Sequence, residues 1–432
     1  MANRCTRIPE IMMPREGTDL SKWAVIACDQ YTSQPEYWAE TDRIVGDAPS
    51  TLRLTLPEVY LEDADVASHI ERIHKTMQQY VQDGTLRTLP AGAVLTERWS
   101  GGSAPRRGIV LAVDLEAYEY TPGSASLIRP TEKTVVERIP PRLKVREGAC
   151  LELPHIMILI DDPDRRIIEP LFEKTGSFSK LYDTDLMQNG GHITGWLVEG
   201  KDVDEFNKAL TEYTATVGEK YTGLKGTPMV FAVGDGNHSL ATAKSCYEEL
   251  KKNNPGVDLS NHPARYALVE LENIHDPAQV FEPIHRVIFK TEPKKLLAAL
   301  EAACAGAEGF PVKWYAGEES GIIVLDKNKG ELAVGILQHL SGIALMPSVK
   351  VAIEGAVVQP CNALKRSGRH LRRSCSAGLL GSRASPLRRL LRPLGDLWAY
   401  KGVSLVLYDS KALLYKVVFG LLGLGRVEVP IG

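Results

Sequence analysis

The residues best suited to chemistry in this chain lie in one stretch, FAVGDGNHSLATAK, at positions 231–244. The apolar residues 231–233 predict the end of a buried strand. A tight turn, 234–237, follows, and residues 239–250 have the pattern of a helix. A glycine turn between a strand and a helix can bind an anion. The first backbone N–H groups of the helix have no partner inside it, and the helix dipole is positive there.

The residue types in this turn suit a phosphate site. Glycine lets a phosphate approach the backbone closely, and a carboxylate such as Asp235 can hold a cation or accept a proton. The candidate binding residues are Gly234, Gly236, Asn237 and Ser239, and the candidates for chemistry are Asp235 and His238. The same spacing also occurs in an ordinary strand-to-helix turn with a capping Asp or Asn, so spacing alone leaves both interpretations open.

A second group of charged residues lies between positions 124 and 162. It contains Glu132 together with four arginines, Arg129, Arg138, Arg142 and Arg146. Arginines at this density suit binding of a polyanion such as a nucleotide. A carboxylate among them can act as a general base toward a small hydroxyl substrate. A solvated, salt-bridged surface segment is the alternative.

Length and composition are those of a globular protein with more than one domain. At 432 residues the chain exceeds one average core. It has no apolar run of about 18 residues and no signal-peptide core, so we expect a cytoplasmic protein without a membrane partner. The seven cysteines include no C-x-x-C pair, which argues against a zinc ribbon and a disulfide framework.

Strand and helix patterns alternate along the chain and predict an α/β (mixed α+β) fold, a mixed sheet with helices on its faces. Residues 23–31 read as a buried strand, and 67–84 as an amphipathic helix. Residues 93–99 and 106–118 read as a hairpin, and 155–162 and 264–273 as further strands. We expect an N-terminal α/β region over 1–120 and a core with the glycine turn over 121–338.

The remaining segment, 339–432, differs from the rest of the chain. Residues 335–432 carry 14 basic and 4 acidic groups, although the whole chain has a net charge of -3. This segment is rich in Arg, Ser, Gly and Leu. Such a composition fits either a basic tail or translation in a shifted reading frame, and we favour the shifted reading frame. We therefore expect this segment to be poorly packed and to leave the fold incomplete.

Several blocks together resemble the domain-of-unknown-function 1015 family over about residues 8–338. They are KWAVIACDQYTSQPEYW, PSTLRLTLPEVYLED, GSASLIR-TE-TVVERIPPR, LPHIMILIDDP, FAVGDGNHSLATAK and HPARYALVELENIHD. Many family members have D-G-H-H-R where this chain has residues 235–239. That motif is similar to the phosphate-binding motif of the ParB/sulfiredoxin superfamily, which includes free-serine kinases. The resemblance implies a ParB/sulfiredoxin-like nucleotide-binding core.

The resemblance implies phosphoryl transfer, as a kinase or phosphatase, from or to a nucleotide such as ATP or ADP. The small-molecule substrate would be serine or a similar hydroxyl compound, and Mg²⁺ would bridge the phosphates and Asp235. Glu132 would take the place of the catalytic carboxylate. Ser239 stands where the family has arginine, and Arg142 or Arg146 could substitute for that phosphate ligand. The family's C-terminal P-R-K-T-F-S-M-G-E-A element is missing.

Two alternatives stay open: a non-catalytic nucleotide-binding regulator of ParB type, and a metabolite-binding protein without chemistry. Residues 1–334 carry 37 basic and 50 acidic groups, the totals of 51 and 54 less the 14 and 4 of residues 335–432. This acidic character argues against nucleic acid, because duplex binding usually needs a basic face.

Overall fold

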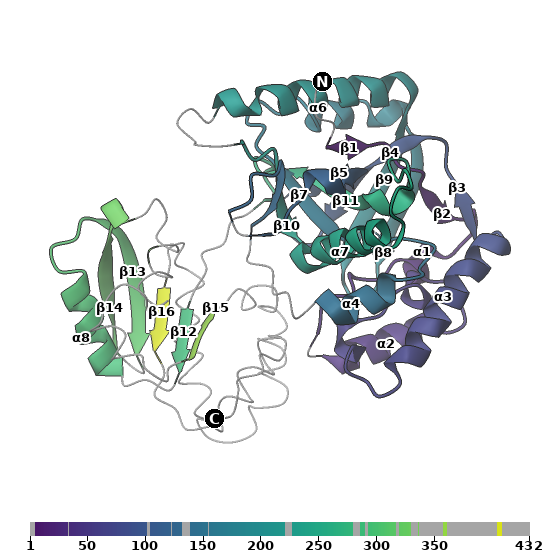
Figure 1. The fold of residues 1–432 in the computed structure, drawn as a ribbon. Coiled ribbons are helices and arrows are strands. Elements are labelled where there is room, and N and C mark those ends of the chain that lie inside the picture. Colours follow the sequence, from purple (N-terminus) through teal and green to yellow (C-terminus); the bar gives the residue numbers. More distant parts are fainter. Residues whose placement is uncertain are drawn as a thin grey trace. The chain divides into compact units, whose positions relative to one another are not determined.

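The structure, a computed structural model, divides into two compact units (Figure 1). It describes residues 5–32, 34–101, 104–121, 123–131, 139–153, 155–220, 227–279, 286–289, 293–316, 319–329, 336, 357–360 and 404–407. Unit 1 comprises Met1–Tyr31 and Pro35–Val280, and unit 2 comprises Thr32–Gln34 and Phe281–Gly432. The boundaries expected near residues 120 and 338 fall inside these units.

Unit 1 is built on a mixed sheet, as the alternating patterns predict. Within the described ranges it has nine strands in the order β6-β10-β7-β11-β5-β4-β9-β8, with β1 added beside β5. The strands are β1 (Thr6–Arg7), β4 (Gly92–Trp99), β5 (Arg106–Asp114), β6 (Ile128–Pro130), β7 (Ile156–Ile160), β8 (Ser179–Leu186), β9 (Gly191–Glu199), β10 (Phe231–Asp235) and β11 (Tyr266–Asn273). The β6–β10 and β7–β11 pairs are parallel, and the other pairs are antiparallel. The predicted β4–β5 hairpin is confirmed.

One face of this sheet forms the core. A single cross-strand row of fully buried residues crosses five strands: Val233, Ile158, Leu271, Ile109 and Leu95. Apolar side chains of α6 (Gly200–Lys220) and α7 (Asn237–Asn253) pack into the same cluster. Because side chains alternate between the two faces of a strand, the residues just before and after each member of this row lie on the opposite face of the sheet.

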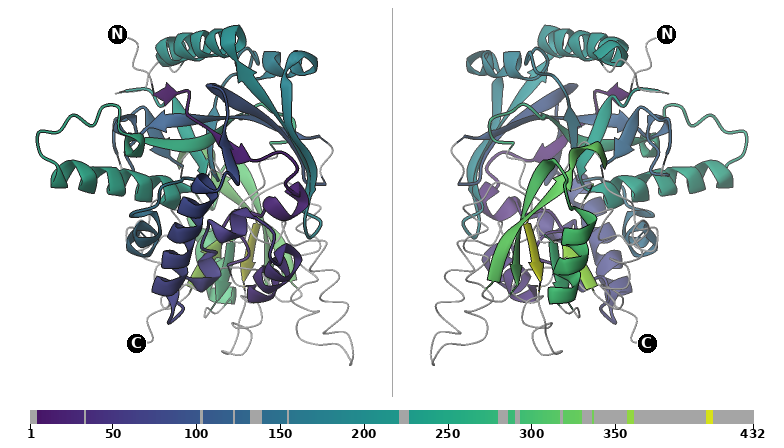
Figure 2. Two further views of the ribbon diagram at one scale, coloured as in Figure 1. Left: turned by 90° about the vertical axis from the view of Figure 1, so that its right-hand side faces the viewer. Right: turned by 90° about the vertical axis from the view of Figure 1, so that its left-hand side faces the viewer.

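The other helices of unit 1 are α1 (Leu20–Trp23), α2 (Pro35–Val45), α3 (Val66–Gln82), α4 (Ile139–Arg146) and α5 (Glu169–Phe172). In Figure 2, α2 and α3 lie at the opposite end of the unit from α6. Strands β2 (Met12–Pro14) and β3 (Leu86–Thr88) form a small antiparallel pair. No helix within the described ranges has both the length and the apolar character needed to span a bilayer.

The strand predicted at residues 23–31 is wrong. Asp19 caps the short helix α1 by accepting a hydrogen bond from the backbone N–H of Ser21, and α1 ends at Trp23. The following residues form coil and a turn. Leu20 and Trp23 pack into a cluster with α3, whereas residues 24–30 are only partly buried and lie outside that cluster. A short apolar run by itself therefore does not establish a strand.

Unit 2 contains a sheet of five strands within the described ranges, in the order β14-β13-β16-β12-β15. The strands are β12 (Arg286–Phe289), β13 (Gly309–Ala316), β14 (Glu319–Asp326), β15 (Val357–Pro360) and β16 (Ser404–Leu407), and α8 (Pro293–Ala303) packs against the sheet. β15 and β16 pair with β12, and β16 also pairs with β13. Two short pieces of the C-terminal segment, which we expected to be poorly packed, therefore form strands of this sheet. The rest of residues 340–432 lies outside the described residues.

Candidate functional site

The turn predicted from the sequence connects β10 to α7. Gly236 is the N-cap residue of α7 and has a left-handed backbone, with φ of 78°. This conformation is disfavoured for residues with a Cβ atom. A Cβ atom at Gly236 would also lie 3.1 Å from Ile156 Cα. The Gly236 N–H donates to Asp235 Oδ1 at 2.8 Å. The predicted strand–turn–helix is therefore confirmed, and Gly236 is the residue that allows the helix to begin here.

The first turn of α7 has N–H groups that find no acceptor inside the helix. Leu240 N is the first helical donor, to Gly236 O at 3.0 Å. By helix geometry the three preceding N–H groups, at residues 237–239, have no acceptor within the helix. The side chain of Asn237 is part of the buried interior, with 6% of the residue exposed, and its Oδ1 accepts no hydrogen bond from the part of the chain that the structure describes. A bound cation or a ligand hydroxyl would satisfy this oxygen.

Ser239, the third residue of α7, contacts a histidine from the neighbouring strand. Its Oγ lies 2.6 Å from Nε2 of His155, the residue before β7, and both residues are partly buried. β7 runs antiparallel to β10, so the start of β7 lies beside the start of α7. Sheet topology therefore brings together two residues that are 84 positions apart.

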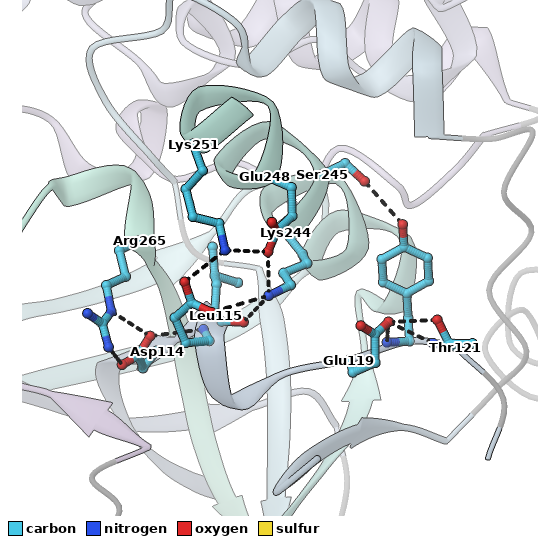
Figure 3. Close-up of polar contacts among 11 residues, drawn as sticks. Asp114, Leu115, Glu119, Thr121, Lys244, Ser245, Glu248, Lys251 and Arg265 are labelled. Carbon is cyan, nitrogen blue, oxygen red and sulfur yellow. Dashed lines mark hydrogen bonds and ion pairs between the residues drawn. The ribbon is translucent and has the colours of Figure 1, made fainter. Parts of the chain in front are cut away.

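A buried lysine holds α7 in place. Lys244 is 8% exposed, and its Nζ donates to the Leu115 carbonyl at 2.9 Å and pairs with Glu248 at 2.8 Å (Figure 3). Lys251, two turns further along, pairs with Glu248 and with Glu116, each at 2.9 Å. These contacts fix α7 against the segment after β5, so its N-terminal end is held at the edge of β7 and β10.

A surface hollow of about 360 Å³ lies at the opposite end of α7, away from the turn. Its charged lining residues include Lys251 and Arg265. Arg265 donates two hydrogen bonds to Asp114, at 2.9 and 2.6 Å (Figure 3). Because the charges of both cations are already paired, we place the functional site at the start of α7 and not in this hollow.

A cluster of buried charges occupies the face of the sheet opposite the core. Arg106 of β5 pairs with Glu270 and Glu272 of β11, each at 2.9 Å. Glu270 also accepts a hydrogen bond from Thr96 Oγ1 at 2.6 Å. Gly108 leaves space for this arrangement, because a Cβ atom there would lie 2.7 Å from Glu270 Oε1. We call Arg106, Glu270 and Glu272 the charge cluster.

The charge cluster reaches toward the turn. Arg106 Nη1 donates to Met157 Sδ at 3.7 Å, and Met157 is the register partner of both Glu270 and Asp235. Strands lie about 4.8 Å apart, so the backbones of Asp235 and Glu270 lie about 10 Å apart across one intervening strand. Asp235 is also among the carboxylates whose charge raises the pKa of Arg106.

The protonation states of the charge cluster depend on one another. Burial raises the pKa of Glu272 well above its usual value, and the adjacent Glu270 charge raises it further, while Arg106 opposes the shift. Burial disfavours the charge of Arg106, but attraction to Glu270 and Glu272 outweighs this and raises its pKa. Burial, followed by repulsion from Arg106, lowers the pKa of the nearby Arg98. The cluster therefore retains a proton more readily than isolated carboxylates do.

The other predicted site residues are placed as follows. Arg142 Nε donates to Glu58 at 2.7 Å, and Arg146 Nη1 donates to Glu152 at 2.9 Å. Each arginine is thus already paired with a carboxylate. Glu132, the predicted base, lies outside the described residues. Its role, and the phosphate-binding roles of Arg142 and Arg146, stay predictions.

The sequence interpretation missed the charge cluster and His155. A signal for the cluster exists in ARYALVELEN, where acids and apolar residues alternate at positions 269–272. Val269 and Leu271 face the core, so this alternation indicates a polar opposite face. No comparable pattern marks His155, because its partner depends on which strands pair.

The part of the chain that the structure describes contains no group of three or more His, Cys, Asp or Glu side chains that could hold a metal ion.

Comparison with known proteins gives a match to a family. The family described as "Protein of unknown function (DUF1015)" matches residues 12–347. Neither a curated protein nor a solved structure matches the chain. The family match covers well over half of the 432 residues. The chain therefore belongs to the DUF1015 family, whose function is unknown.

Proposed function

We propose that the chain is a phosphoryl-transfer enzyme that binds the phosphates of ATP or ADP at the first turn of α7. The observation that carries the proposal is the left-handed backbone conformation of Gly236, which allows α7 to begin at this point. The first N–H groups of α7 lie where β10 ends and the antiparallel β7 starts. N–H groups that have no acceptor inside the helix, together with the positive helix dipole, favour a phosphate at this position. Anchoring through Lys244 holds these groups in place before a ligand binds.

Mg²⁺ fits the oxygen groups of the turn. Mg²⁺ is usually held by one or two protein oxygens together with substrate phosphates. Asp235 offers a carboxylate, and Asn237 offers the buried amide oxygen that lacks a donor among the described residues. When bound, the ion would neutralise phosphate charge as it is transferred. This chain's own groups then bind and orient: the α7 N–H groups hold the phosphate, and Asp235 and Asn237 hold the ion.

The acceptor in this proposal is a small hydroxyl compound such as serine. Glu132 is the proposed base, by resemblance to the free-serine kinases. A ParB/sulfiredoxin-like core and a cytoplasmic location are parts of the same proposal.

Calorimetric titration of the full chain with ADP, with and without Mg²⁺, tests the proposal. We expect Mg²⁺-dependent binding that Asp235→Asn weakens by about 10- to 100-fold, the scale of one lost charge-assisted contact. Asp204→Asn, an exposed residue of α6, is the matched control and should bind as the wild type does. Absence of binding, or equal binding by both variants, would exclude the turn as the nucleotide site.

Two further measurements separate the alternatives. Transfer from labelled ATP to serine distinguishes an enzyme from a metabolite-binding protein. Added duplex DNA that tightens nucleotide binding without any transfer would favour a regulator of ParB type.

A further inference from the structure

The contact between His155 and Ser239 differs from those of the other hydroxyl groups on α7. Thr242 Oγ1 donates to the His238 carbonyl, and Ser245 Oγ lies 3.3 Å from the Tyr120 hydroxyl. Only at Ser239 does a hydroxyl of this helix meet an imidazole nitrogen, at 2.6 Å, among the residues described. A serine hydroxyl is a weak nucleophile by itself, and an adjacent imidazole is the usual base that activates it.

The surroundings of Ser239 favour negative charge. It lies in the first turn of α7, where the N–H groups of residues 237–239 have no acceptor inside the helix. These donors and the helix dipole stabilise an alkoxide forming on Oγ and the negative charge on a group that Oγ attacks. The base is in contact with the nucleophile, and the anion-stabilising donors belong to the same helical turn.

We propose that Ser239 is a covalent nucleophile activated by His155, and that it accepts the terminal phosphoryl group of a nucleoside di- or triphosphate. The identity of this donor rests on the proposed function; the nucleophile rests on the His155–Ser239 contact. In the tautomer that carries hydrogen on Nδ1, Nε2 of His155 accepts the Ser239 hydroxyl proton.

The first step forms a bond between Ser239 Oγ and phosphorus. The bond from phosphorus to the leaving nucleotide oxygen breaks, and that oxygen keeps the electron pair. The product is a phosphoserine at position 239 and an imidazolium at His155. In the second step the acceptor hydroxyl attacks phosphorus and releases its proton to solvent. The Ser239 oxygen leaves with the electron pair and takes back the proton held by His155.

A fluorophosphonate probe tests the nucleophile without any nucleotide. Attack by Oγ releases fluoride and leaves a phosphonyl group on the serine, which peptide mass spectrometry locates. We expect labelling at Ser239 and none at Ser245, which is the internal control on the same helix. His155→Gln keeps a polar side chain of similar size but not the base, and should slow labelling by at least about 100-fold, the usual scale of general-base catalysis. Circular dichroism and thermal melting verify that this variant is folded.

A second measurement tests the donor. Incubation with ATP and Mg²⁺ should add one phosphoryl group to Ser239 in the wild type and none in Ser239→Ala. Absence of fluorophosphonate labelling at Ser239, or equal labelling rates in wild type and folded His155→Gln, overturns the proposal. A wild type that binds ATP but never carries phosphoserine also overturns it. Labelling at Ser239 without any nucleotide binding would refute the proposed function and leave the nucleophile assigned.

Discussion

Replacing Arg106 with methionine should destabilise unit 1 far more than the same change at the next residue. Among the residues that the structure describes, Arg106 is the one ion-pair partner of Glu272, which is fully buried, and it also pairs with the largely buried Glu270. At an effective dielectric of about 20, each pair contributes about 4 kcal/mol. The substitution also removes the cost of burying the charged guanidinium, and this offsets several kcal/mol of the lost attraction. We expect a net loss of about 3–5 kcal/mol, because two buried carboxylates lose their counterion.

Arg107→Met is the matched control. Arg107 lies in the same strand and pairs with Glu97 at 2.9 Å, but its side chain is 42% exposed. Pairs this exposed contribute about 0–1 kcal/mol. The deficit of Arg106→Met should also shrink as the pH falls from about 8 to 5, because protonation neutralises the carboxylates left behind.

Amide hydrogen exchange of the full chain, followed in peptides from β5 and β11, measures the opening free energy of this region. Urea unfolding gives the overall change. Equal losses in the two arginine variants, or a deficit for Arg106→Met that does not depend on pH, would refute the assignment of a charged, mutually dependent cluster.

Three further predictions concern pH and backbone geometry. The raised pKa of Glu272 means that the folded state binds its proton more tightly than the unfolded state does, so stability falls as the pH rises above about 4.5. Glu272→Gln should flatten this dependence in urea titrations at several pH values; an unchanged slope would contradict the shift. Hydrogen bonds to two aspartates of β8 raise the pKa of His192. Its stabilisation should be present below about pH 6.5 and be lost as the pH rises through the folded pKa. This contribution stays under about 1 kcal/mol because the group is partly exposed, and NMR titration of its imidazole reports the shift directly. Gly236→Ala should lower the free energy of unfolding by about 1–3 kcal/mol through backbone strain, and by more through the contact of its Cβ atom with Ile156. Gly256 has a similar φ of 84°, but a Cβ atom there would have nothing within 4 Å, so Gly256→Ala should show the loss from strain alone. Equal losses at the two glycines would remove the packing argument.

Local sequence patterns are enough to predict the β10–turn–α7 unit and the β4–β5 hairpin, because each depends on residues close in the chain. The charge cluster could not be predicted in the same way. Arg106 and Glu270 are 164 positions apart and meet only because β5 pairs with β11. The contact between His155 and Ser239 likewise depends on the antiparallel pairing of β7 and β10. A local pattern shows that a face is polar, but the order of strands decides which groups meet.

The position of β16 has a consequence for how the protein is synthesised. In the sheet of unit 2, β16 lies between β13 and β12, although it comes last in the chain. A ribosome releases the other four described strands before Ser404–Leu407 emerges, so β12 and β13 cannot be joined through β16 until that segment has been synthesised. Unit 1 has no such requirement, because its described strands end at Asn273 and it can begin to fold during translation. The nascent chain thus carries open strand edges on β12 and β13 until β16 emerges, and this interval is when chaperone protection matters most for unit 2.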